Sequence, residues 1–134
     1  MNKFNIRVYA IIQNEHNAVL ICDEVHNGVF MTKFPGGGLE WGEGIHDCLK
    51  RELMEEFRFE LVEIEFFYVN EFFQQHYARK NEQVIALYYR CKVQGEPQPQ
   101  ESHVEFRWVP LIEIHPEMMT FPTDKKAAEL LVWL

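Results

Sequence analysis

The sequence predicts a mixed fold of the α/β or α+β class. Segments rich in Val, Ile, Phe and Tyr recur along the chain at strand length, around two segments with the pattern of helices. The 134 residues can bury one core but are too few for two domains of ordinary size, so we expect one domain over residues 1–134. Apolar residues make up 47% and charged residues 25%, the balance of a globular protein that folds without a partner.

Three strands are predicted in the N-terminal part. Residues 5–13 alternate β-branched or aromatic residues with polar ones, and residues 19–22 continue this pattern after the polar stretch NEHNA. A third, short strand fits residues 29–32. Pro35 and the glycine run that follows it are expected to end regular structure and to leave an exposed backbone.

A helix is predicted over residues 45–57. Its apolar residues recur at every fourth position and form one stripe: Ile45, Leu49, Leu53 and Phe57. Gly44 is a suitable N-cap, and Asp47 in the first turn would interact favourably with the helix dipole.

The C-terminal part predicts three more strands and a closing helix. Residues 59–73 and 84–93 are rich in Val, Ile, Phe and Tyr, and the polar stretch QQHYARKNEQ between them suggests two long antiparallel strands with a flexible loop. A strand is expected at residues 104–109, after a polar loop that contains prolines, and a helix at residues 124–134.

Charge and cysteine content exclude several classes of protein. With 13 basic and 21 acidic residues, the net charge of -8 would repel a nucleic-acid polymer, whereas a small phosphate compound carried with metal is compatible. No apolar run approaches the roughly 20 residues of a membrane helix, and no signal-peptide cleavage site is present. Cys22, Cys48 and Cys91 lie far apart and form no CxxC pair, which argues against a disulfide scaffold or zinc cluster. We therefore expect a cytoplasmic protein.

Three carboxylates gather on one face of the predicted helix. Glu52, Glu55 and Glu56 stand at i, i+3 and i+4, within an arc of about 100°. Like charges at this spacing repel one another unless a cation lies between them, and hard oxygen ligands suit Mg²⁺ or Mn²⁺. The alternative is an ordinary solvated acidic helix face.

The spacing of these residues resembles the signature of the Nudix hydrolases. The family signature is a glycine followed by five residues, Glu, seven residues, Arg-Glu, an aliphatic residue, any residue and Glu-Glu. The stretch PGGGLEWGE resembles the usual approach to this signature. The positions that match are Gly37, Glu43, Arg51, Glu52, Leu53, Glu55 and Glu56, with Phe59 at the final position. Arg58 stands where the family usually has a glycine, so either Arg58 accepts a left-handed conformation or the helix ends differently.

The resemblance implies an α/β/α sandwich with a mixed β-sheet and assigns roles to the matching residues. Glu52, Glu55 and Glu56 would bind the metal next to Gly37, with Glu52 also a candidate base for the attacking water. Glu43 would act through water or structure. Arg51 would orient the acids by ion pairing, since its guanidinium has a fixed fork suited to carboxylates. Gly36 and Gly37 would permit close backbone approach to metal or phosphate.

Three functions follow as hypotheses. The leading one is Mg²⁺-dependent hydrolysis of the pyrophosphate linkage of a nucleoside diphosphate derivative, in which metal-activated water attacks in line. The second is a Nudix-fold module that binds a nucleotide without turnover, and the third is a purely structural acidic domain. The sequence does not choose among nucleoside triphosphates, nucleotide sugars such as ADP-ribose and dinucleoside polyphosphates.

Several further residues are weaker candidates for the site. Lys33, Arg79 and Lys80 could meet a phosphate, although exposed solubilising charges are more typical. Glu101 and Glu105 lie near where many relatives supply another carboxylate, and a surface role is the alternative for each. Cys48 could line the site as a small residue, and the histidines at 76, 103 and 115 show no metal-ligand spacing. Aromatic residues could stack on a base or form a core or homodimer interface: Phe66, Phe67, Tyr68, Phe72, Phe73 and Tyr77.

Overall fold

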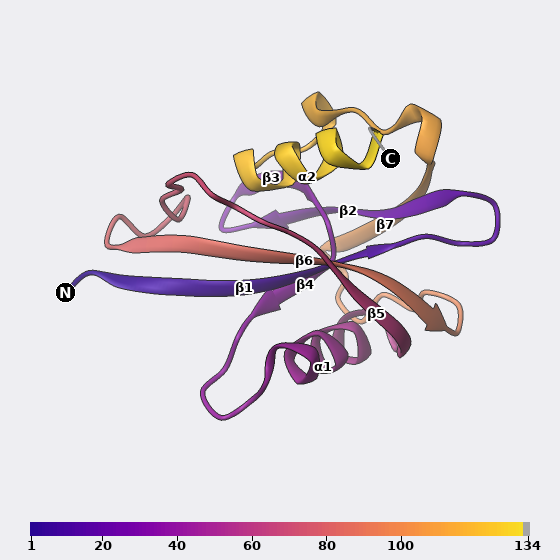
Figure 1. Cartoon of the computed structure of the whole chain (residues 1–134), viewed down its shortest axis with the longest axis horizontal. Helices are drawn as coiled ribbons and strands as arrows, with labels where there is room; N and C mark the ends of the chain where they lie inside the picture. Colours follow the sequence, from indigo (N-terminus) through magenta and orange to yellow (C-terminus); the bar gives the residue numbers. More distant parts are fainter. Residues whose placement is uncertain (133–134) are drawn as a thin grey trace.

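A computed structural model describes residues 1–132 and confirms the mixed fold class, with strands between two layers of helix (Figure 1). In chain order the elements are β1 (Lys3–Ile12), β2 (Ala18–His26), β3 (Val29–Lys33), β4 (Gly36–Gly38), α1 (Ile45–Phe57), β5 (Glu60–Val69), β6 (Glu82–Gln94), β7 (Val104–Pro110) and α2 (Pro122–Val132), with 3₁₀ helices at Leu111–Glu113 and Pro116–Met118. None of the helices in this part of the chain is long and apolar enough to cross a membrane.

The strands form two sheets. The first has the order β4-β1-β6-β5 and is mixed, because β1 runs parallel to β6 and antiparallel to β4, while β5 and β6 are antiparallel as predicted. The second has the order β3-β2-β7 and is antiparallel throughout. The parallel pair β1 and β6 lies in the middle of the first sheet and is its longest pairing (Figure 1).

Alternate residues of β1 belong to two different hydrophobic clusters, as expected for a strand that is covered on both faces. Val8 and Ala10 belong to the cluster that contains Leu49 and Leu53 of α1. Tyr9 belongs to the other, which contains residues of α2. The helices lie on opposite sides of the strands (Figure 1), so the carboxylate helix α1 docks through its apolar stripe, as its sequence pattern predicts.

The glycine run corrects one prediction. It does not end regular structure but forms β4, which pairs antiparallel with β1, and Gly36 and Gly37 are buried. The approach of the two strands is too close for other residues at one position, since a Cβ on Gly36 would lie 2.1 Å from the carbonyl oxygen of Val8. Glycine is therefore what allows β4 to add to the edge of β1.

Element boundaries also differ from those predicted. Strand β2 continues to His26 because it pairs with β3 and β7 beyond the apolar run that predicted it. Strand β5 ends at Val69, so Phe72 and Phe73 lie in the connection to β6. Helix α2 begins at Pro122 rather than Asp124, and residues 133–134 of the predicted helix lie outside the described part of the chain.

Backbone hydrogen bonds define the two ends of α1, the helix that carries the carboxylates. Gly44 is the N-cap, as predicted, and its backbone N–H donates to the Asp47 carboxylate at 3.3 Å. At the other end Arg58 takes the left-handed conformation, with φ 60° and ψ 28°, and its N–H donates to the carbonyl of Met54. The helix thus ends as it would with glycine, and Arg58 accepts the strain.

Candidate active site

A cavity of about 390 Å³ opens at the glycine strand β4. Its wall is made by residues of all the strands except β5, by α1, by the segment between β5 and β6, by the segment before β7 and by the start of α2. The three glutamates predicted to act together, Glu52, Glu55 and Glu56, all line this cavity. The helical spacing therefore places them on one face beside a concave site, where Glu52 and Glu56 are partly buried and Glu55 is exposed.

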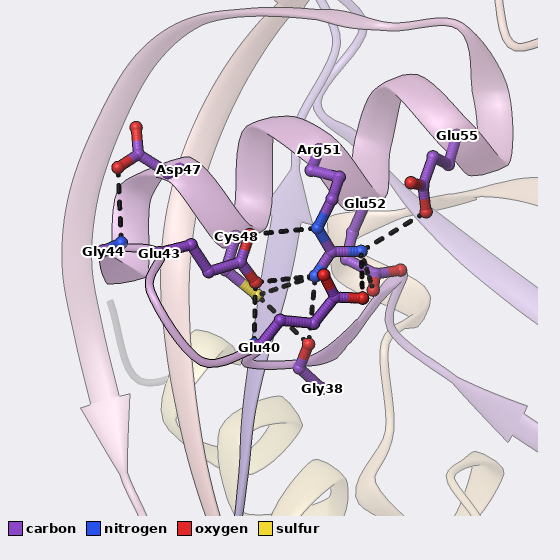
Figure 2. Close-up of polar contacts among 9 residues, drawn as sticks. All are labelled: Gly38, Glu40, Glu43, Gly44, Asp47, Cys48, Arg51, Glu52 and Glu55. Atoms are coloured by element: carbon purple, nitrogen blue, oxygen red, sulfur yellow. Dashed lines mark hydrogen bonds and ion pairs between the residues drawn. The ribbon is translucent and has the colours of Figure 1, made fainter.

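Arg51 is the centre of an ion-pair network along α1 (Figure 2). Its Nε and Nη2 donate to the two carboxylate oxygens of Glu43 at 3.0 and 2.7 Å, and Nη2 also donates to the carbonyl oxygen of Gly38. Its Nη1 lies 2.9 Å from Glu52 Oε1 and 3.3 Å from Glu55 Oε2. The guanidinium thus ties the segment before the helix to two of the three acids.

This network shifts the pKa values of Glu43 and Arg51. The hydrogen bonds from Arg51, followed by the backbone hydrogen bond at Glu40, lower the pKa of Glu43 to about 2, so its carboxylate is ionised throughout the ordinary pH range. The hydrogen bond to Glu43 is also the largest cause that raises the pKa of Arg51. Both groups are held charged, which keeps the network intact.

Glu56 has a different environment. Burial is the largest cause that raises the pKa of its carboxyl above the ordinary value; the nearby charge of Lys33 opposes this shift, and a hydrogen bond to Glu52 with its negative charge adds to it. Two carboxylates that approach each other in this way are stabilised either by a shared proton or by a cation.

The donor set fits a divalent metal in its chemistry. It consists of carboxylate oxygens, the ligands that Mg²⁺ and Mn²⁺ prefer. A Cβ at Gly37 would lie 2.5 Å from the Glu52 carboxylate, so glycine leaves the space in which that carboxylate sits. Within residues 1–132 no three acidic, histidine or cysteine side chains already meet at one metal-binding point, since Arg51 lies between Glu52 and Glu55.

Lys33 corrects a second prediction. Its side chain is not an exposed solubilising charge but is 9% exposed, and it lines the cavity. Its Nζ lies 3.6 Å from Glu24 Oε1 and 5.4 Å from the centroid of the Tyr9 ring. The ion pair with Glu24 and the aromatic face of Tyr9 compensate for the burial of this charge.

The other weaker candidates divide into two groups. Arg79 and Glu101 line the rim of the cavity, and Arg79 is paired with Glu82 at 3.2 Å. Glu105 is exposed on β7 and is not part of the cavity wall, and Lys80 borders a second, smaller pocket.

Cys48 corrects a third prediction, because it packs in the core beneath the helix rather than lining the cavity. Burial, with the hydrogen bond to Glu43, raises the pKa of its thiol to about 12, which excludes a thiolate nucleophile.

The aromatic candidates separate in the same way. Tyr77 lines the cavity, stacks on His76 at 4.7 Å between ring centroids and lies 5.6 Å from Phe121. Phe67 and Tyr68 pack against the core, whereas Phe66, Phe72 and Phe73 are exposed. The histidines at positions 76 and 103 both line the cavity, and the side chain of the histidine at position 115 caps the start of a 3₁₀ helix.

Several residues of the cavity wall were missed in the sequence, and three of them bring polar groups to it. Arg7 and Tyr9 point into it from β1, and Asp124 reaches it from the first turn of α2. The sequence did carry a signal for Arg7, since this charged residue interrupts an otherwise largely apolar stretch. Asp124 left none, because an acidic residue in a first helical turn usually interacts with the helix dipole alone.

Asp124 is 2% exposed, and the Tyr88 hydroxyl donates to its carboxylate. Burial raises the pKa of this carboxyl to about 6, against the opposing effects of that hydrogen bond and of the charges on Lys33 and Arg7. The cavity therefore has an acidic group at the α2 side as well as at the α1 side.

The helix that carries the three carboxylates and Arg51 thus lies against a glycine strand beside the cavity. The family model described as NUDIX domain matches residues 3–134. This chain belongs to the Nudix family and is a pyrophosphohydrolase, an enzyme that acts on phosphoric anhydrides. No curated protein sequence matches it.

Solved structures share the fold. A MutT structure from work on Aliivibrio salmonicida and Vibrio cholerae has a TM-score of 0.78 at 20% identity and covers 98% of both chains. The Escherichia coli ORF135 protein has a TM-score of 0.78 at 20% identity, over 96% of this chain and 88% of its own. A MutT protein from Methanosarcina mazei has a TM-score of 0.72 at 24% identity, over 97% and 94%. These likenesses establish the α/β/α architecture with a mixed sheet.

Proposed function

We propose that this protein is a Mg²⁺-dependent hydrolase that cleaves the pyrophosphate linkage of a nucleoside diphosphate derivative, with Mn²⁺ as an alternative ion. The observation that carries the proposal is the position of Glu52, Glu55 and Glu56, which line one cavity beside a strand without side chains. Family membership supports the general reaction; the metal and these residue roles are part of the proposal.

Each residue of the network has a defined task in this proposal. Glu52, Glu55 and Glu56 hold the ion through carboxylate oxygens, and Mg²⁺ when bound would neutralise the diphosphate and lower the pKa of a water molecule. Glu52 takes a proton from the attacking water at a carboxylate oxygen. Arg51 fixes Glu52 and Glu55, and Glu43 in turn holds Arg51 by two hydrogen bonds.

The hypothesis of a module that binds a nucleotide without turnover rested on Arg58, and the structure removes this support. Arg58 was the one departure from the family pattern near the carboxylates, and it takes the backbone conformation that a glycine would take. The purely structural hypothesis also loses support, because the Glu52 side chain is only 15% exposed whereas a solvated acidic face would leave it open.

The proposal extends to the setting of the enzyme. A small nucleotide, rather than a nucleic-acid polymer, suits a cavity of about 390 Å³ in a chain with a net charge of -8. The cytoplasm suits three cysteines that are all free. A homodimer, if formed, would use exposed aromatic residues such as Phe66 and Phe73.

The test incubates the protein with Mg²⁺ and nucleoside triphosphates, nucleotide sugars or dinucleoside polyphosphates in ¹⁸O-water, and identifies products by mass. Glu56→Gln should lower turnover by about 100-fold or more, the scale of losing one electrostatic contact in an active site. Glu60→Gln, on the exposed start of β5, is the matched control and should remain fully active. Turnover by Glu56→Gln at the level of this control would show that the site is assigned wrongly.

A further inference from the structure

The cavity wall contains two arginines with different surroundings. Arg79 is already paired, since its Nη1 lies 3.2 Å from each carboxylate oxygen of the buried Glu82. Arg7 donates from Nε to the Tyr9 hydroxyl at 2.6 Å, and among residues 1–132 no carboxylate oxygen lies within 4 Å of it. The described part of the chain therefore leaves the charge of Arg7 without a carboxylate partner.

The remaining N–H groups of Arg7 face the cavity. In the described residues every buried side-chain nitrogen or oxygen has a hydrogen-bond partner, and the only partner of Arg7 there is Tyr9 at Nε. Its Nη groups must therefore be accessible to solvent in the cavity that Arg7 lines. The hydrogen bond at Nε fixes the plane of the guanidinium, and the fork at its other end stays open.

The glycine strand brings this fork close to the carboxylates. Arg7 and Gly38 face each other across β1 and β4, and a Cβ on Gly38 would lie 3.6 Å from Arg7 Nη1. Glu52 packs against the adjacent glycine, Gly37, on the other face of the same strand. Because β4 has no side chains, groups from its two faces reach one cavity around its edge.

A phosphate is the ligand that this arrangement fits. A guanidinium fork binds two oxygens of a phosphate in a bidentate manner, and an unpaired cation beside an acidic site attracts an anion that the net charge of -8 would otherwise repel. Arg79 and Lys33 are less suited, since each already has a carboxylate partner.

We propose that Arg7 binds a phosphate group of the substrate through its Nη atoms, from the face of β4 opposite the carboxylates of α1. This inference rests on the proposed function, because it takes the anion to be the substrate diphosphate. The fork positions one phosphate while the glutamates act at the other end of the anhydride, so the bond to be cleaved lies across the edge of the glycine strand.

The first test measures phosphate binding in the presence of EDTA, with tripolyphosphate as the probe and ³¹P NMR titration as the readout. Arg7→Gln should weaken binding tenfold or more, the scale of a charge-assisted bidentate contact. Arg7→Lys keeps the charge but loses the fork and should fall between Arg7→Gln and the wild type. Arg107→Gln is the matched control, an arginine of β7 that is already paired with Asp23 and does not line the cavity, and it should change binding by less than about twofold.

The second test uses the cleaved substrate with Mg²⁺, once one is identified, and compares KM and kcat for the same variants. Arg7→Gln should raise KM and lower kcat/KM, and its thermal unfolding midpoint should lie near that of Arg107→Gln.

The outcomes separate this inference from the proposed function. Arg7-dependent binding in EDTA without any turnover would support the phosphate site and overturn the hydrolase proposal. Turnover lost in Glu56→Gln with binding and KM unchanged in Arg7→Gln would overturn the phosphate site alone. Failure of the wild type to bind millimolar tripolyphosphate would also overturn it.

Discussion

The buried carboxyl of Asp124 gives a prediction whose size follows from the structure. Its pKa is raised by burial from 3.8 to about 6 in the folded protein. Between these values the folded protein keeps a proton that the unfolded chain has lost, so the folded state binds more protons and the free energy of unfolding falls as the pH rises. The difference of about 2 pKa units corresponds to about 3 kcal/mol, at roughly 1.4 kcal/mol per unit.

The perturbation is Asp124→Asn. The amide keeps an oxygen that can accept the hydrogen bond from the Tyr88 hydroxyl, but it carries no charge at any pH of the experiment. Relative to this variant, the wild type should lose about 3 kcal/mol of stability between about pH 4 and about pH 6, and no more above that range. Urea unfolding followed by tryptophan fluorescence at a series of pH values measures both proteins. The difference between them removes the contribution of all other acids, which titrate alike in the two chains.

Two results would refute this reasoning. A difference in unfolding free energy that stays flat with pH would mean that the pKa of Asp124 is the same in the folded protein as in the unfolded chain. A wild type that gains stability relative to Asp124→Asn as the pH rises would mean that Lys33 and Arg7, whose charges oppose the shift, outweigh burial.

Two further predictions concern α1 and β4. Arg58→Gly should stabilise the protein by up to about 1 kcal/mol in urea unfolding and leave turnover unchanged. The left-handed strain of about 1–2 kcal/mol that it removes is partly offset by the entropy of glycine in the unfolded chain. A destabilised variant would contradict the assignment of strain to Arg58. Gly37→Ala should lower turnover about tenfold or more, because its Cβ would lie 2.5 Å from the Glu52 carboxylate. In the control Gly38→Ala, the Cβ would make an ordinary contact with Arg7 Nη1 at 3.6 Å, and activity should stay within about twofold. Equal activities of these two variants would contradict the proposed position of Glu52.

The parts of the structure that sequence predicted are those encoded locally. The apolar stripe of α1, its N-cap at Gly44 and the shared face of its carboxylates all depend on spacing within one helix, and the structure has them as predicted. Sequence cannot supply pairings between distant segments. Glycines have low strand propensity, and β4 forms only because the edge of β1 pairs with Gly36 to Gly38.

The same limit explains the residues of the cavity that were misread. Lys33 reads as an exposed charge until β3 pairs with β2 and brings it beside Glu24. Arg7 reads as an interruption of an apolar strand until its cross-strand neighbour is known to be Gly38 of the glycine strand at the cavity. Both roles depend on strand neighbours that lie far away in the chain, and no local pattern encodes them.

The unusual end of α1 shows why a strained residue is tolerated so close to the carboxylates. With Arg58 left-handed, the N–H of Phe59 donates to the carbonyl of Leu53, and the chain turns back so that Phe59 is 1% exposed and lies 5.8 Å from Phe57. Burial of one phenylalanine stabilises by about 1.5–3 kcal/mol, which exceeds the strain of about 1–2 kcal/mol at Arg58. The turn therefore anchors the end of the helix in the core, two residues beyond Glu56. A residue other than glycine can hold this position because packing, not backbone preference, decides where the helix ends.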